Sequence, residues 1–250
     1  MGTAIISKIS KRFQVSVSEK DLERQKFLKA DYKIATGSLK DVVSHAQVIV
    51  LAVKPQDFDL VLKEISECVT KNKLVISIAA GITTQYIEKK LGKGIKVVRA
   101  MPNLPAQIGQ AMTGICKGKN ATSVDLNLTQ DIFNSIGQTV IIDEKWMDAI
   151  TAVSGSGPAY VFLFAECFMS AAIKLGFSQI QSKQLVEQTL RGSLDLLTQS
   201  NEDAAALRMR VTSKGGTTQA AMDVFMKGGM QKIFNEALKA AEKRAKELAK

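Results

Sequence analysis

The sequence has few of the residues that build histidine-based or cysteine-based active sites. Its 250 residues include one histidine, His45, and three cysteines, Cys68, Cys116 and Cys167. A single histidine excludes a Ser-His-Asp triad and any histidine-based metal cage. The cysteines are odd in number and show no CxxC spacing, so neither a zinc site nor a disulfide framework is indicated. We therefore expect no metal cofactor.

A secretory signal and long apolar runs are also missing. No apolar run approaches the roughly 20 residues that span a bilayer. The short apolar patch from Ala4 to Ile6 is interrupted at once by Lys8, which is unlike a signal peptide. These absences predict a cytoplasmic protein without a membrane partner.

The chain is basic, with 34 Lys and Arg against 24 Asp and Glu and a net charge of +10. No aromatic-basic interleaving or zinc-finger pattern accompanies this excess, so we expect no nucleic-acid partner. Much of the excess lies in residues 239–250, where Lys, Glu and Arg alternate as on a solvated helix face. The remainder suits a protein that binds a phosphate-rich cofactor and an anionic substrate.

Apolar patterning divides the chain into two domains, at residues 1–146 and 147–250. Before Trp146, Val- and Ile-rich runs alternate with amphipathic stretches, which predicts a doubly wound, Rossmann-like α/β domain. The expected strands are Phe13–Val17, Val48–Val53, Leu74–Ala79, Ile95–Val98 and Thr139–Ile142. After Trp146 the pattern is helical throughout, over 158–176, 178–198, 204–211, 217–227 and 230–250.

The helix expected over 159–175 is apolar on nearly every side, with Val161, Phe162, Leu163 and Phe164 in succession. A helix that is apolar all round must be buried all round. Five helices in about 100 residues make a small bundle that does not easily enclose it. We therefore predict that the second domain is an all-α dimerisation domain.

The segment from Leu207 to Asp223, LRMRVTSKGGTTQAAMD, is the most informative in the chain. Its glycines allow successive backbone N–H groups to converge, and the helix that follows adds its unpaired first-turn N–H groups and the positive end of its dipole. Such a place favours a small anion, typically a carboxylate or a phosphate. An ordinary capped helix has the same composition, and the segment alone does not decide between the two.

Four motifs together identify a family. AVKPQ (52–56), RAMPN (99–103), ITAVSGSGPAYVF (150–162) and VTSKGGTT (211–218) occur in this order, and the chain closely resembles pyrroline-5-carboxylate reductase. The resemblance implies reduction of a cyclic imine to L-proline with NADPH or NADH, the last step of proline biosynthesis. It also implies an interlocked helical homodimer, which in such families can stack into larger rings.

The resemblance begins inside the dinucleotide-binding fingerprint. The expected strand–GxGxxG–helix sequence is absent, and Gly2 corresponds to its last glycine. The first strand and most of the phosphate loop are therefore not in this sequence. Either the natural protein starts upstream, which we favour and which its measured mass would test, or the chain is short and binds dinucleotide weakly.

The resemblance also assigns site residues. Thr218 would be catalytic, its hydroxyl bonded to the substrate ring nitrogen, and the SGSGP segment from Ser154 to Pro158 would pack near the nicotinamide. The substrate carboxylate would be held by Ser213, Gly215, Gly216, Thr217 and Thr218. The cofactor would be bound by Gly2, Ser18, Ser38, Ala52, Val53, Lys54, Pro55, Ala79, Ala80, Met101, Pro102 and Asn103.

Cofactor preference and activity stay open at this point. Ser18, Lys20 and Arg24 favour the 2′-phosphate of NADPH, whereas Glu19 favours the ribose hydroxyls of NADH. A related reductase or dehydrogenase acting on another cyclic imino acid or a β-hydroxy acid is one alternative. A truncated, catalytically impaired helical dimer is another.

Overall fold

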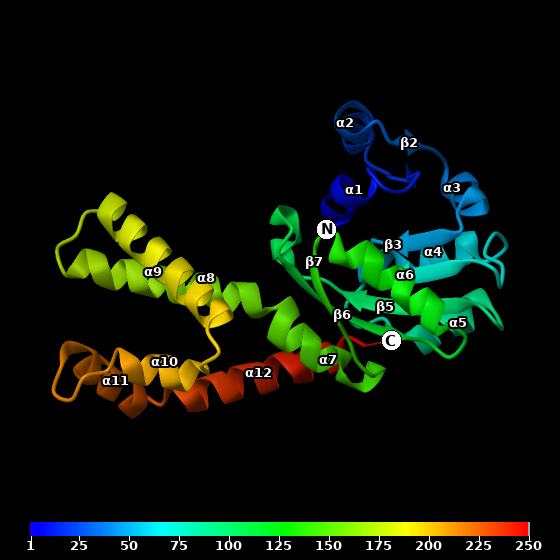
Figure 1. The fold of residues 1–250 in the computed structure, drawn as a ribbon. Coiled ribbons are helices and arrows are strands. Elements are labelled where there is room, and N and C mark those ends of the chain that lie inside the picture. Colours follow the sequence, from blue (N-terminus) through cyan, green and yellow to red (C-terminus); the bar gives the residue numbers. More distant parts are fainter. Residues whose placement is uncertain (250) are drawn as a thin grey trace. The chain divides into compact units, whose positions relative to one another are not determined.

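The computed structural model of the chain describes residues 1–249 in two compact units. The first comprises residues 1–158 together with the end of the chain from Ala240, and the second comprises Ala159–Lys239. The division expected from the sequence, 1–146 and 147–250, placed the boundary earlier and kept the end of the chain with the helices. Figure 1 shows the course of the chain through both units.

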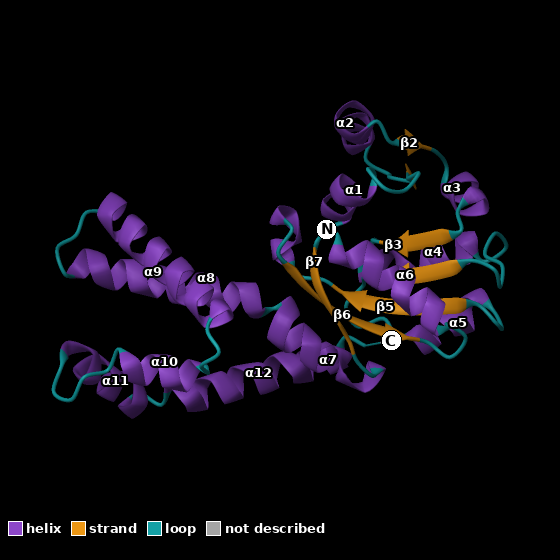
Figure 2. Ribbon diagram, viewed as in Figure 1, coloured by secondary structure: helices purple, strands orange, loops and turns teal. Residues whose placement is uncertain are grey.

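A five-stranded sheet forms the centre of the first unit (Figure 2). Its strands lie in the order β3 (Val48–Leu51), β4 (Leu74–Ser77), β5 (Lys96–Met101), β6 (Ala111–Lys117) and β7 (Gly137–Ile141). Strands β3, β4 and β5 are parallel, β6 is antiparallel to β5, and β7 is parallel to β6. The expected doubly wound domain is confirmed, but β6 was not predicted because its sequence, AMTGICK, carries glycine and polar residues.

The strands β1 (Ser16–Val17) and β2 (Ala35–Thr36) pair with each other in parallel and form a separate two-stranded sheet. They are followed by helices α2 (Leu22–Tyr32) and α3 (Leu39–His45). Within the described residues, β1 and β3 each have one edge without a strand partner. In the order 3-2-1-4-5-6 the first strand lies between these two edges.

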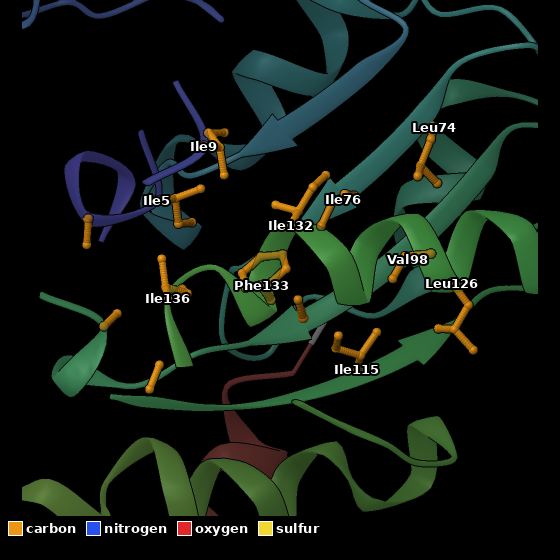
Figure 3. Packing of buried hydrophobic residues seen from close by; sticks show 14 of the residues in the cluster. Ile5, Ile9, Leu74, Ile76, Val98, Ile115, Leu126, Ile132, Phe133 and Ile136 are labelled. Carbon is orange, nitrogen blue, oxygen red and sulfur yellow. The ribbon is translucent and has the colours of Figure 1, made fainter. Parts of the chain in front are cut away.

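Both faces of the larger sheet are covered, as its Val- and Ile-rich strands require. On one face, Ile76 packs with Ile5 of α1 (Gly2–Ile9) and Phe133 of α6 (Ser123–Asn134), as Figure 3 shows. On the other face, Val75 packs with side chains of α4 (Phe58–Ile65) and α5 (Thr84–Leu91). Neighbouring residues of β4 therefore serve opposite cores, which fixes the register of this strand.

A short connection leads from the sheet to the second unit. The 3-10 turn Glu144–Trp146 and helix α7 (Met147–Ile150) are followed by a π-helical turn, Thr151–Gly155. The turn is closed by a hydrogen bond from the Ser156 N–H to the Thr151 carbonyl, at 2.8 Å. Such wide turns are rare and occur frequently at functional sites.

The second unit is helical, as predicted. Its helices are α8 (Gly157–Lys174), α9 (Gln179–Gln199), α10 (Ala204–Arg210), α11 (Thr217–Lys227) and α12 (Met230–Glu247), of which the first two residues of α8 and the part of α12 from Ala240 belong to the first unit. Although α8 is strongly apolar, Phe162 and Leu163 are each 59% exposed in the single chain, and Phe164 and Phe168 are also exposed. This unit leaves a large apolar helix surface to be covered by something else.

One helical run among residues 1–249, from Glu144 to Lys174, has the length and composition of a membrane span. The expectation that no segment approaches such a span is therefore wrong by this measure. A helix buried in a protein assembly passes the same test, so length and composition alone do not assign this run to a membrane.

Candidate active site

Three of the predicted cofactor-binding turns lie at one edge of the sheet. Ala52–Pro55 follow β3, Ala79 and Ala80 follow β4, and Met101–Asn103 end and follow β5. These three strands are adjacent and parallel, with Leu51 paired to Ser77 and Ser77 to Arg99. Their carboxyl ends therefore meet, and open α/β sheets bind ligands at this edge.

The start of α1 lies at the same edge. A Cβ atom built on Gly2 would be 3.6 Å from the Cβ of Ala52. Helix α1 begins here without a side-chain cap, so its first N–H groups and its dipole are available to an anion. The arrangement fits the pyrophosphate of a dinucleotide, for which Gly2 was predicted.

The residues after β1 combine basic side chains with a carboxylate that is already engaged. The Glu19 carboxylate accepts hydrogen bonds from the Lys20 and Asp21 N–H groups, at 2.8 and 3.2 Å. Its other oxygen lies 3.9 Å from the Arg24 guanidinium. The carboxylate thus stabilises its own turn, while Ser18 and Lys20 are exposed.

Ser38 and Lys54 lie at the starts of short helices. The Ser38 hydroxyl caps α3 by accepting from the Asp41 N–H, at 3.2 Å. Lys54 precedes the 3-10 turn Pro55–Asp57, and its carbonyl accepts from the Asp57 N–H at 2.9 Å. Ordinary strand-end and helix-start turns make the same backbone contacts, so these contacts by themselves do not indicate a cofactor.

Asn103 makes the best-defined polar contacts of the site. Its Nδ2 donates to the Ser154 carbonyl at 3.1 Å and lies 3.4 Å from the Ser154 hydroxyl. Its Oδ1 accepts from the Met112 N–H at 3.0 Å, and the Ser154 hydroxyl donates to the Met112 carbonyl at 3.2 Å. The loop after β5, the start of β6 and the π-helical turn are therefore joined by one closed network.

Gly155 lies against Met101 in the same region. A Cβ atom at position 155 would be 2.9 Å from the Met101 Cε, closer than such atoms approach in proteins. The absence of a side chain at Gly155 leaves room for the Met101 methyl group. The structure thus brings together the MPN motif and the SGSGP segment, both of which the resemblance places near the nicotinamide.

The glycine loop of the second unit has the geometry of a helix start. Gly215 has a φ of +72°, in the left-handed region that favours glycine, and Gly216 precedes α11 without a side-chain cap. The Gly216 N–H donates to the Ser213 carbonyl at 3.0 Å. The anion nest predicted from Gly215, Gly216, Thr217 and Thr218 is therefore smaller than expected, since the Gly216 donor is used within the turn.

A buried ionic cluster on β5, close in the sequence to the Met101–Asn103 loop, was not predicted from the sequence. The Arg99 side chain lies 3.7 Å from Glu144 and 3.6 Å from Asp148. Glu144 also accepts from the N–H and the hydroxyl of Thr84, at 2.7 and 2.6 Å. An arginine among the buried residues of the strand Lys96–Met101 was the available signal, because a charge in a buried strand requires partners.

Cys116 is opposite Arg99 in the sheet register and is buried. Burial raises the pKa of its thiol to about 12, with a further contribution from the Glu144 charge. Such a thiol is protonated at neutral pH and is a poor nucleophile. Within residues 1–249, no group of three or more His, Cys, Asp or Glu side chains is arranged to hold a metal ion.

Comparison with known proteins decides between the families that share this fold. Residues 144–248 match the family model for pyrroline-5-carboxylate reductase dimerisation, and residues 1–81 match that for NADP oxidoreductase, coenzyme F420-dependent. The pyrroline-5-carboxylate reductase of Mycobacterium leprae is 34% identical over 254 residues, covering 93% of this chain and 86% of the relative. The chain belongs to the pyrroline-5-carboxylate reductase family.

Solved structures of the family agree with this fold. A pyrroline-5-carboxylate reductase from Coxiella burnetii matches with a TM-score of 0.93 and 35% identity, over 100% of this chain and 95% of that one. The Plasmodium falciparum pyrroline carboxylate reductase, solved with NADP bound, has a TM-score of 0.89 and 32% identity over the same shares. The fold is therefore the Rossmann-like domain and helical dimerisation domain of this family. The family match places α8 in the dimerisation region and supports a homodimer.

Proposed function

We propose that the chain reduces 1-pyrroline-5-carboxylate to L-proline with a reduced nicotinamide cofactor, NADPH being preferred. Family membership fixes the class of reaction. The observation that carries the assignment to this chain is the closed network of Asn103, Ser154 and Met112, next to the carboxyl ends of three parallel strands. This network joins the MPN motif to the SGSGP segment at the place where a nicotinamide ring is expected.

The residues of the first unit fit a dinucleotide. The uncapped start of α1 at Gly2 suits the pyrophosphate, and the turns after β3 and β4 suit the chain between the two rings. At the other end of the site, the Met101 methyl group lies close to Gly155, where a side chain would displace it. When bound, the cofactor supplies the hydride that adds to the imine carbon.

The residues of the second unit fit the imino acid. The N–H groups of Thr217 and Thr218 open α11 without a side-chain cap, so they are available to the substrate carboxylate. In this proposal the Thr218 hydroxyl donates a hydrogen bond to the ring nitrogen, which gains one proton as the adjacent carbon gains the hydride. The hydride on carbon and the proton on nitrogen together convert the C=N double bond into a C–N single bond, which gives the secondary amine of proline, and the carboxylate takes no part in the reaction.

Preference for NADPH is part of the proposal. Glu19, the residue expected to favour NADH, has its carboxylate held by two backbone N–H groups and by Arg24. Ser18 and Lys20 are exposed after β1, where a 2′-phosphate is expected. In this proposal Arg24 also faces the 2′-phosphate, so Arg24→Ala should raise the KM for NADPH by about tenfold, the effect of losing one charged hydrogen bond, with little change for NADH.

The test of the function is the initial rate of NADPH oxidation by the purified chain with 1-pyrroline-5-carboxylate, and separately with its six-membered-ring homologue. Preference for the five-membered ring supports the proposal, and preference for the larger ring favours a related cyclic-imine reductase. NADPH binding without turnover of either favours the catalytically impaired dimer. A cytoplasmic location belongs to the same proposal, and fractionation of cells that produce the protein would test it.

A further inference from the structure

The strand that ends in the MPN motif carries a buried charge four residues before Asn103. Arg99 is 2% exposed and lies in β5 between Ser77 of β4 and Cys116 of β6. A buried guanidinium is stable only with compensating charge. Its partners, Glu144 and Asp148, both come from the connection that leads out of the sheet toward the second unit.

This connection is attached to β5 a second time, a few residues later. Ser154, in the π-helical turn, is bonded to Asn103 just beyond the end of the strand. Between the two attachments, Ile150 lies against β6, where a Cβ atom on Gly114 would be only 2.7 Å from the Ile150 Cγ2. The segment from Glu144 to Gly155 is therefore held along β5 and β6 at both ends and in the middle.

The ion pairs of Arg99 attach the connection to β5, and we call this attachment the anchor. Arg99 Nη2 and Asp148 Oδ1 are both buried and lie 3.6 Å apart, and neither has a hydrogen-bond partner within the described residues. The attraction between them therefore acts through charge and does not depend on a bond of fixed direction. Glu144 is fixed more rigidly, because the Thr84 N–H and hydroxyl both donate to it.

We infer that Arg99 is a positioning residue for the reduction. Its ion pairs with Glu144 and Asp148 hold the connection, and the connection determines where Ser154 and Gly155 lie relative to Met101 and Asn103. Arg99 is 2% exposed and is enclosed by protein, so its side chain is not open to a substrate or a nicotinamide. It acts through the connection that it holds. This inference rests on the proposed function, because only a nicotinamide at Met101 makes that spacing matter for the rate.

The test uses a variant that removes Arg99 and its more buried partner together, while Glu144, which is partly exposed, keeps its two hydrogen bonds from Thr84. Arg99→Gln combined with Asp148→Asn removes one positive and one negative charge together. The matched control is Lys96→Gln with Asp125→Asn, which removes a half-buried ion pair of 3.1 Å from the other end of the same strand. Both double variants are compared with the unmodified chain for folding by circular dichroism.

Two readouts separate positioning from a structural role. The first is kcat and its isotope effect with NADPH deuterated at the transferred position. Misplacement by about 1 Å costs up to about 100-fold in rate, so the Arg99 variant should lose about 10- to 100-fold in kcat and show a larger isotope effect. A variant that only lowers the folded fraction reduces the amount of active protein but leaves KM and the isotope effect unchanged. We expect this second result for the control variant.

The second readout does not depend on turnover. The Met112 N–H is bonded to Asn103 Oδ1, so its hydrogen exchange reports on the network directly. In the Arg99 variant this amide should exchange at least tenfold faster, and in the control it should not. Unchanged exchange and a kcat within twofold of the unmodified chain would overturn the inference. Absent turnover of the unmodified chain would instead refute the proposed function, and the exchange measurement would still decide whether Arg99 holds the network.

Discussion

Shortening one exposed aromatic side chain on α8 should dissociate the dimer by a calculable amount. Phe162 is 59% exposed in the single chain. Full burial of such a side chain stabilises by about 1.5–3 kcal/mol, so covering the exposed part contributes about 1–2 kcal/mol per copy. In a twofold dimer the side chain occurs twice, which gives about 2–4 kcal/mol. Phe162→Ser should therefore raise the dimer Kd by about 30- to 1000-fold.

The assay is sedimentation equilibrium over a range of protein concentrations. The control is Leu60→Ser on α4, because Leu60 is 67% exposed but belongs to the first unit. The control should leave the dimer Kd unchanged. A Kd for Phe162→Ser within threefold of that of the unmodified chain would refute the assignment of this helix face to the dimer, and equal dissociation by both variants would show a non-specific effect.

Four further outcomes follow from the site and the fold. Thr218→Ala should lower kcat about 10- to 100-fold without abolishing activity, because positioning contributes more than one hydroxyl; an unchanged kcat and KM would remove Thr218 from the site. Gly155→Ala should raise the KM for NADPH several-fold by displacing the Met101 methyl, and an unchanged KM would show that this contact is not near the cofactor. Burial opposes ionisation of Asp125, but hydrogen bonds from Thr122 and Lys96 outweigh it and lower its pKa below 3.8. The ionised carboxylate therefore contributes stability above that pH, and this contribution is lost as the pH falls through the lowered pKa. In Asp125→Asn the free energy of unfolding should depend less on pH below about pH 4. Adding a strand and a glycine loop ahead of Gly2 should pair the open edges of β1 and β3 and tighten NADPH binding, as titration calorimetry would show.

The sequence predicted most of the fold because its signals are local. Runs of Val and Ile bounded by polar residues marked β3, β4 and β5, and helical periodicity marked α8 to α12 within a few residues of their ends. The strand β6 was not predicted because its burial depends on pairing with β5 and β7 more than on its own composition. The pairing of β1 with β2 in a sheet of their own also depends on contacts distant in the sequence.

The sequence named the parts of the candidate site, which stay predictions, but not their contacts. The motifs placed Asn103 and Ser154 near one cofactor ring, but their hydrogen bonds depend on the π-helical turn, which has no recognised sequence pattern. The use of the Gly216 N–H within its own turn likewise follows from the backbone conformation at Gly215. The partners of Arg99 lie more than forty residues away in the sequence, so the strand alone could indicate that they exist but not which they are.

The central claim is that the chain is an NADPH-dependent reductase of 1-pyrroline-5-carboxylate, and the formation of proline from one enantiomer of this substrate tests it most directly. The purified chain would be incubated with NADPH and racemic 1-pyrroline-5-carboxylate, and the proline formed would be resolved by chiral chromatography. We predict L-proline in an amount equal to the NADPH oxidised, and none when NADPH is omitted. NADPH oxidation without proline, or folded dimer that forms no proline in either the 250-residue chain or its extended version, would contradict the claim.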